Sequence, residues 1–133
     1  MKFLNQNQLK IINMDVLFIN PDSSSQAYQD LSKVYSAIET PTWSLLLAES
    51  CRSKGFSVEI LDCDAERLSL KGSADRVKKS SPRLVVFAVY GQNPNSGTTS
   101  MIGAFELAKS LKKSGLEVPI CFVGSHTSAL PLE

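Results

Sequence analysis

The sequence predicts an open α/β fold, in which helices cover both faces of a parallel sheet. Four short runs rich in β-branched and aromatic residues support this prediction: residues 16–19 (VLFI), 58–61 (VEIL), 84–89 (LVVFAV) and 119–123 (PICFV). The runs are mostly continuous rather than alternating, as in strands that are buried on both faces. Helical patterns separate the runs, so strands and helices alternate along the chain. We predict the strand order 2-1-3-4.

The first helix is expected to begin at Thr40, whose side chain can cap the first turn, with Pro41 at the first helical position. Gly55 can adopt the left-handed conformation that ends this helix. Four side chains recur at helical spacing and are expected to face the sheet: Trp43, Leu46, Leu47 and Cys51.

A second helix is expected over residues 74–80, before Pro82. The third helix should close at Gly115, after three lysines that favour a helix C-terminus. Its apolar stripe consists of Met101, Ala104, Phe105, Ala108 and Leu111. Because sheets of this kind usually have at least five strands, we expect the domain either to be truncated at its C-terminal end, with a fifth strand missing, or to be completed by a neighbour.

Composition and charge exclude several classes of protein. The chain has 133 residues, of which 43% are hydrophobic and 20% charged, enough for one domain with its own core. Its net charge of +1 gives no electrostatic basis for binding nucleic acid or an anionic membrane. No apolar run approaches the length of about 18 residues that a membrane-spanning helix needs, and the N-terminus is not a secretory signal.

The three cysteines, Cys51, Cys63 and Cys121, are widely spaced in apolar surroundings. An odd number spaced in this way predicts reduced core thiols rather than disulfides, and therefore a cytoplasmic protein. We expect residues 1–14 to be an N-terminal extension and residues 15–133 to form the α/β domain.

Polar and turn-forming residues gather where the predicted strands end. They lie at residues 20–25 (NPDSSS), 62–64 (DCD), 90–96 (YGQNPNS) and 124–127 (GSHT). Because ligands of open α/β sheets bind outside the carboxyl ends of the strands, this enrichment indicates one functional rim. The plainer interpretation is that most loops are polar, and that the aspartates at 62 and 64 cap the turn after the second strand.

Missing motifs exclude several known chemistries. The chain has no GxxxxGK(S/T) phosphate loop and no GxGxxG fingerprint after a strand. Its cysteines form no CxxC or CxxxCxxC pair that would hold zinc or an iron–sulfur cluster, so we assign no metal ligands and no catalytic residues. A flavodoxin-type phosphate turn is matched only by residues 23–25 (SSS), which lie too far from a helix N-terminus.

Four segments in a fixed order resemble the cobalamin-binding domain found at the N-terminus of many radical S-adenosylmethionine enzymes. They are VLFINP from residue 16, TPTWSLLLAESCRSKGFSVEILDCDAERLS from residue 40, SPRLVVFAVYG from residue 81 and VPICFVGSHTSALPLE from residue 118. The resemblance covers the chain from residue 15. It implies a flavodoxin-like, Rossmann-like fold with cobalamin on the carboxyl rim of the sheet.

The resemblance also implies which residues contact the cofactor. The turn after the fourth strand should lie along the nucleotide tail, and the turn after the third strand should form another wall. The implied cofactor-binding residues are Thr42, Tyr90, Gly91, Gln92, Asn93, Gly124, Ser125, His126 and Thr127. Glycine at 124 would let a bulky ligand approach the backbone, whereas Ser125 stands where the family often has a second glycine. Trp43 would also approach the corrin, although packing on the sheet is its more common role.

No DxHxxG motif, whose histidine binds cobalt in other cobalamin carriers, follows the first strand. The resemblance therefore implies cobalamin bound with its own base displaced and without a protein histidine on cobalt. His126, the one histidine, is interpreted as an exposed loop residue or a tail contact, and least readily as a cobalt ligand.

By this resemblance the chain is a cobalamin-binding module that works with a catalytic radical S-adenosylmethionine domain, in cis or in trans. That domain would hold the iron–sulfur cluster and S-adenosylmethionine, so we do not expect catalysis from this chain alone. The alternative is a flavodoxin-like binding or regulatory domain that has lost the cofactor and acts through protein–protein contacts. A flavin-binding module is a third option. The fourth strand would be an exposed edge, open to pairing in a homodimer.

Overall fold

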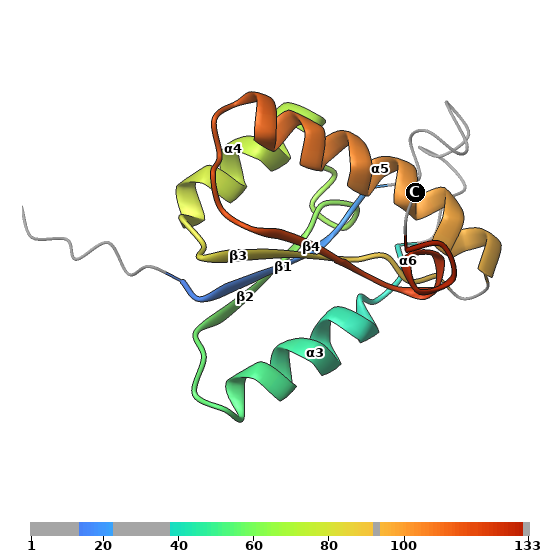
Figure 1. The fold of residues 1–133 in the computed structure, drawn as a ribbon, viewed down its shortest axis with the longest axis horizontal. Helices are drawn as coiled ribbons and strands as arrows, with labels where there is room; N and C mark the ends of the chain where they lie inside the picture. Colours follow the sequence, from blue (N-terminus) through green and yellow to red (C-terminus); the bar gives the residue numbers. More distant parts are fainter. Residues whose placement is uncertain (1–13, 23–37, 92–93, 132–133) are drawn as a thin grey trace, which may run out of the picture.

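Four parallel strands form the centre of the molecule (Figure 1). The computed structural model describes residues 14–22, 38–91 and 94–131. The strands are β1 (Val16–Asn20), β2 (Val58–Asp62), β3 (Leu84–Ala88) and β4 (Ile120–Val123). They pair in the order β2-β1-β3-β4, and every pair is parallel. The predicted α/β fold with strand order 2-1-3-4 is confirmed.

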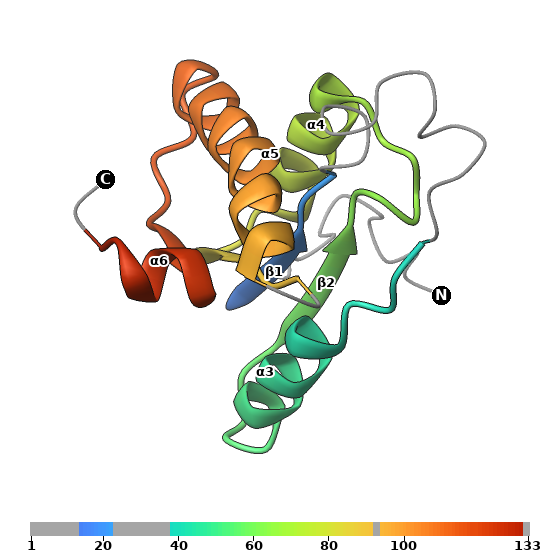
Figure 2. The same ribbon diagram turned by 90° about the vertical axis from the view of Figure 1, so that its right-hand side faces the viewer.

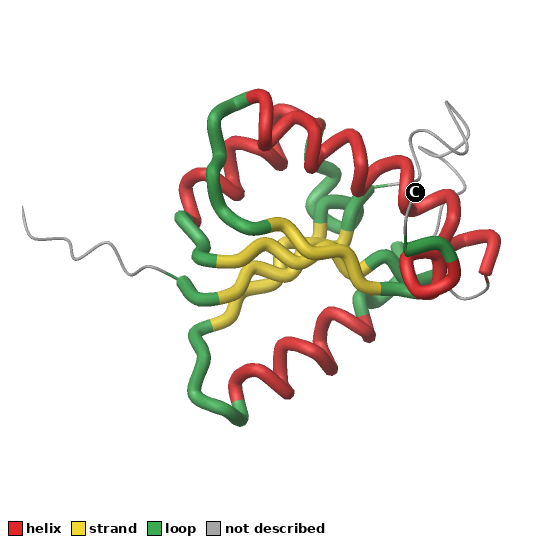
Figure 3. The backbone as a smooth tube through the Cα atoms, viewed as in Figure 1, coloured by secondary structure: helices red, strands yellow, loops and turns green. Residues whose placement is uncertain are grey.

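Helices cover both faces of this sheet, as Figure 3 shows. Helix α3 (Thr42–Arg52) lies on one face, and helices α4 (Leu70–Ser80) and α5 (Pro94–Lys113) lie on the other. The short helix α6 (Ser125–Ala129) follows β4 and contacts α5 (Figure 2). This arrangement brings the carboxyl ends of β3 and β4 close to the N-terminal turns of α5 and α6.

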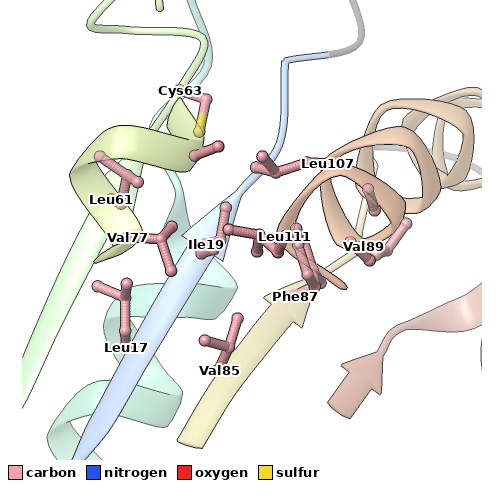
Figure 4. Packing of buried hydrophobic residues seen from close by; sticks show 13 residues of the cluster. Leu17, Ile19, Leu61, Cys63, Val77, Val85, Phe87, Val89, Leu107 and Leu111 are labelled. Atoms are coloured by element: carbon pink, nitrogen blue, oxygen red, sulfur yellow. The ribbon is translucent and has the colours of Figure 1, made fainter. Parts of the chain in front are cut away.

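Two apolar clusters fill the space between the sheet and its helices. On the α4 and α5 side, Leu17, Ile19 and Phe87 of the strands pack with Val77 of α4 and Leu111 of α5, and all are fully buried (Figure 4). The smaller cluster on the α3 side consists of Val16, Phe18, Ala48 and Val86. Successive strand residues point to opposite faces, and both faces of β1 are buried, which explains why its apolar run is continuous.

Helix α3 differs from its prediction in its cap and in its buried face. It begins at Thr42 after Pro41 and no side chain caps it, so the predicted cap at Thr40 is wrong. Its fully buried residues are Ser44 and Ala48, whose small side chains let the helix lie close to the sheet.

Two of the four side chains expected to face the sheet from α3 are largely exposed instead. Trp43 is 49% exposed and Leu46 is 58% exposed, so their predicted packing is wrong. Leu47 and Cys51 do pack against the cluster on the α3 side. The sheet-facing stripe runs through residues 44, 47, 48 and 51, which is regular helical spacing. A prediction from apolar residues alone misses the position of this stripe, because its first member is Ser44.

Helix α4 starts at Leu70 rather than at residue 74 because a side-chain cap extends it. The Ser69 hydroxyl accepts a hydrogen bond from Gly72 N at 3.1 Å. The glycines expected to end the first and third helices do adopt left-handed conformations, with φ of +89° at Gly55 and +82° at Gly115.

Helix α5 is longer than its predicted stripe and begins at Pro94, which shortens the turn after β3. Met101 packs against the core cluster that contains Ala104, as expected for that stripe. Phe105 is 54% exposed, so its predicted burial is wrong. The Lys109 ammonium group lies 5.9 Å from the centre of the Phe105 ring, which gives the exposed ring a cationic neighbour.

The three cysteines differ in exposure, although all are free. Cys63 is buried and Cys51 is half-buried, in line with the prediction of core thiols. Cys121 is exposed, so that prediction is wrong for β4, which is the outer strand of the described sheet. Among the described residues, no helix has both the length and the apolar character needed to cross a membrane.

Candidate functional site

The carboxyl ends of β1 and β2 are joined by side-chain and backbone hydrogen bonds. Asn20 and Asp62 lie opposite each other in the strand register, and Asn20 Nδ2 donates to Asp62 Oδ1 at 3.0 Å. The same Asp62 oxygen accepts a hydrogen bond from Ala65 N at 3.1 Å. Asp62 therefore caps the turn after β2, and the plainer interpretation of this residue is confirmed.

An aromatic pair lies at the rim on the α3 side of the sheet. The rings of Trp43, in the first turn of α3, and Tyr90, just after β3, stack with centroids 4.6 Å apart and an interplanar angle of 21°. Trp43 is half exposed, so the pair presents aromatic surface to solvent at the carboxyl end of the sheet. Sequence reasoning placed both residues near the rim but not in contact, because they are distant in sequence.

The carboxyl end of β4 packs directly on the carboxyl end of β3. Gly124 is buried, with φ +150° and ψ 177°, and a Cβ there would lie 2.7 Å from the Val89 carbonyl carbon. Val89 N also donates to Val123 O at 2.7 Å. Glycine is thus required at position 124 by contact with the protein's own backbone, rather than by the approach of a ligand as the sequence suggested.

The first turn of α5 meets the start of α6 beside this contact. A Cβ on Gly97 would lie 2.7 Å from Ser125 Oγ, so glycine at 97 leaves the space that the Ser125 side chain occupies. Thr98 Oγ1 lies 3.2 Å from His126 Nδ1, in a hydrogen bond whose donor depends on the histidine tautomer. Gly97 and Thr98 were not among the residues predicted from the sequence, although a small residue in the first helical turn after a strand is a signal that could have indicated them.

The predicted turn after β4 is in fact the start of a helix. Ser125, His126 and Thr127 belong to α6, and Thr127 Oγ1 donates to Gly124 O at 3.1 Å. His126 is half-buried in this helix, so its interpretation as an exposed loop residue is wrong. Gly124 is the N-cap residue of this helix, and its carbonyl oxygen accepts a hydrogen bond from Ser128 N at 3.1 Å.

The rim brings together most of the residues predicted to bind the cofactor. Through the contact between residues 89 and 124, the group Gly124, Ser125, His126 and Thr127 lies beside the end of β3, where Tyr90 and Gly91 follow. Thr42 is exposed on α3 next to the aromatic pair, and its hydroxyl donates to Thr40 O at 3.3 Å. Gln92 and Asn93 lie outside the described residues.

A small cavity lies on the α4 and α5 side of the rim. Its volume is about 80 Å³, room for a few water molecules at most, and Asp22, Cys63, Ser73 and Glu106 are among its lining residues. Burial raises the pKa of the Cys63 thiol to about 11, so this thiol is neutral near pH 7 and is not a reactive thiolate. In the part of the chain that the structure describes, no three His, Cys, Asp or Glu residues could hold a metal ion together.

The fold and the rim together define a flavodoxin-like α/β domain whose exposed aromatic and hydroxyl side chains gather at the carboxyl ends of its strands. The family model for the B12 binding domain matches residues 29–133, which run from the segment after β1 through α6. The chain therefore belongs to the B12 binding domain family. No curated protein matches the chain. No solved structure matches it either.

Proposed function

We propose that this chain binds cobalamin on the carboxyl rim of its sheet, with residues 15–133 as the binding domain. The family match over residues 29–133 carries the proposal, because it covers every element that surrounds the rim except β1. The cavity beside the rim is far too small for a corrin ring, so the cofactor would rest on the open rim itself. Cobalamin would supply the cobalt chemistry, and the protein would position it.

The described rim residues fit a large, partly apolar ring that carries polar groups on its edge. The stacked Trp43 and Tyr90 offer a flat aromatic surface, of which Trp43 is half exposed. Hydroxyl groups of Thr42 and Thr127 lie on the same rim and can hydrogen-bond amides. We infer that the turn starting at Tyr90 and the first turn of α6, capped by Gly124, form two walls of the site. Ser125 and His126 belong to the second wall, and the sequence resemblance assigns Gln92 and Asn93 to the first.

We further propose that cobalamin binds base-off and without a protein histidine on cobalt. β1 ends at Asn20 and leads into Pro21 and Asp22, and the single histidine of the sequence lies on α6 instead. There the Nδ1 atom of His126 is 3.2 Å from Thr98 Oγ1 and is engaged with α5. The role of His126 in this proposal is to hold α6 against α5 along the nucleotide tail.

The catalytic partner in this proposal is a radical S-adenosylmethionine domain, which would hold the iron–sulfur cluster and S-adenosylmethionine in cis or in trans. The sequence resemblance supports this assignment, and the outer surface of α3 is consistent with it. Besides Trp43, two further large apolar side chains on α3 are exposed, Leu45 at 48% and Leu46 at 58%. A helix that is apolar on both sides usually has a second neighbour, and this helix starts at the proposed cofactor site.

Binding can be tested by mixing the protein with hydroxocobalamin or with flavin mononucleotide, removing free ligand by gel filtration and recording absorption spectra. We expect retained corrin bands, no retained flavin, and quenching of the fluorescence of Trp43, the only tryptophan. Tyr90→Ala should weaken cobalamin binding, by about tenfold if the lost contact contributes about 1.4 kcal/mol. Phe105→Ala, an exposed aromatic on α5, is the matched control and should bind like the wild type.

The binding mode has its own readout in the spectrum of the bound cobalamin. Binding should convert the base-on spectrum of free cobalamin to the base-off form, and His126→Ala should leave that base-off spectrum unchanged. A base-on spectrum in the complex, or a change of cobalt ligation in His126→Ala, would contradict this mode. If the wild-type protein retains no corrin at all, the alternative is supported: a domain that has lost the cofactor and acts through protein contacts.

A further inference from the structure

Glycine at position 97 leaves a space that the Ser125 side chain fills. Gly97 is buried in the first turn of α5, and a Cβ there would lie 2.7 Å from Ser125 Oγ. The same Cβ would lie 3.9 Å from Val89 O and 4.0 Å from Gly91 N. The end of β3, the start of α5 and the start of α6 therefore meet at this glycine. We call the space beside Gly97 that holds the Ser125 hydroxyl group the serine slot.

The backbone of Ser125 is held in place on both sides. The residue before it, Gly124, lies against the backbone of Val89. The residue after it, His126, has its Nδ1 atom 3.2 Å from Thr98 Oγ1, and this contact joins α6 to α5 (Figure 2). A side chain has three staggered positions about its first torsion, so rotation is the easiest movement left to the serine. Closing the serine slot would therefore turn the hydroxyl group to one of its two other positions.

We propose that Gly97 is a positioning residue of the cofactor site, because it keeps the Ser125 side chain out of the path of the nucleotide tail. This inference rests on the proposed function, in which the first turn of α6 forms a wall of the cobalamin site. Ser125 is exposed at the start of that turn, so a hydroxyl group that leaves the serine slot moves towards the open surface of the rim. The serine slot thus makes a serine at position 125, where the family often has glycine, compatible with a bulky ligand.

The effect of Gly97 should be confined to ligands that carry the nucleotide tail. Cobinamide is a corrinoid without that tail, so it can occupy the rim without passing residue 125. Gly97→Ala should weaken cobalamin binding by about tenfold or more, as crowding by one extra group does, and leave cobinamide binding unchanged. The double variant Gly97→Ala/Ser125→Gly should restore cobalamin binding, because it has no side chain at position 125 to displace.

Titration of the full chain with each corrinoid, followed by the fluorescence of Trp43, the only tryptophan, measures both affinities. Gly72→Ala is the matched control. Gly72 also lies in the first turn of a helix, α4, and its Cβ would lie 3.3 Å from Ser69 Oγ. Because α4 follows β2 rather than β3 or β4, this variant should bind cobalamin like the wild type.

A second variant tests the serine slot without changing Gly97. Ser125→Thr adds a methyl group to the same Cβ, and the slot has room for one group. The other group must point out of the slot, so this variant should also bind cobalamin more weakly and cobinamide normally. In the ligand-free protein, the NMR couplings between Hα and Hβ of Ser125 report its rotamer directly. They should differ between wild type and Gly97→Ala, and identical couplings would overturn the proposal.

The two corrinoids separate the failure of this proposal from the failure of the proposed function. A wild-type protein that binds neither corrinoid would refute the proposed function, and this role of Gly97 with it. Equal losses for cobalamin and cobinamide in Gly97→Ala would indicate general damage to the domain and refute only the role of Gly97. The same conclusion would follow if Gly97→Ala bound cobalamin like the wild type, or if the double variant bound it no better than Gly97→Ala.

Discussion

Replacing Gly124 with alanine should strongly destabilise the domain. The backbone at Gly124, with φ +150° and ψ 177°, lies in a region that is essentially restricted to glycine, and a side chain there costs about 1–3 kcal/mol. The new Cβ would also lie 2.7 Å from the Val89 carbonyl carbon, below the 3.0 Å that real Cβ contacts reach. Such overpacking against backbone costs about 1–3 kcal/mol more. We therefore expect the free energy of unfolding to fall by about 2–6 kcal/mol.

Thermal and urea unfolding followed by circular dichroism measure this loss. For a domain of this size each kcal/mol lowers Tm by about 3–5 °C, so even the middle of the range is a shift of more than about 10 °C. Gly55→Ala is the matched control: Gly55 also has a positive φ, +89°, but no atom lies within 4 Å of the position of its Cβ. That control should lose only about 1–2 kcal/mol. Equal losses in the two variants would refute the argument that contact with Val89 requires glycine at 124.

Three further predictions follow from the described contacts. Gly97→Ala should destabilise the protein because its Cβ would meet Ser125 Oγ at 2.7 Å, and Ser125→Gly should restore most of the loss; additive losses in chemical unfolding would disprove the coupling. The raised pKa of Cys63, about 11 against 9.0, contributes stability that is complete below pH 9 and lost as the pH rises towards 11, so urea unfolding should show a smaller alkaline loss for Cys63→Ala. The pKa of Asp15 is lowered below 3.8 mainly by the hydrogen bond from Ser57 N, helped by the Ser57 hydroxyl, and this stabilisation is lost as the pH falls through the lowered value. Ser57→Ala should therefore raise the Asp15 pKa measured by carboxyl NMR, and an unchanged value would show that the hydroxyl has no effect.

Local patterns were sufficient for the strands and for two helix ends. The four apolar runs form the four strands. The runs of β1 and β3 are continuous because these two strands lie inside the described sheet and are covered on both faces. Gly55 and Gly115 ended their helices as predicted because a left-handed residue is a local need. The helix faces were harder, since Ser44 replaces an apolar residue on the buried stripe of α3 and Phe105 lies outside that of α5.

The residues of the candidate site were predicted from their positions at the ends of the strands, but the contacts between them were not predicted. Residues that follow β3 and β4 do lie together at the carboxyl rim, which parallel pairing in the order β2-β1-β3-β4 makes necessary. Glycine at position 124 was predicted to make room for a ligand, whereas the group that lies against it is the backbone of Val89. No local pattern could have shown this, because the contact joins the ends of two strands with helix α5 between them.

Contacts between distant segments account for the rest of the rim. Thr98 and His126 are 28 positions apart and meet only because α5 and α6 both begin at the carboxyl edge. Trp43 stacks on Tyr90 because α3 covers the face of the sheet opposite to α4 and α5 and its first turn lies at the carboxyl edge (Figure 1). Strand, helix and turn propensities depend on residues that are near in sequence, so these elements can be predicted from the sequence alone. Which side chains touch at the rim depends on how the crossovers place whole elements, and that information exists only in the folded molecule.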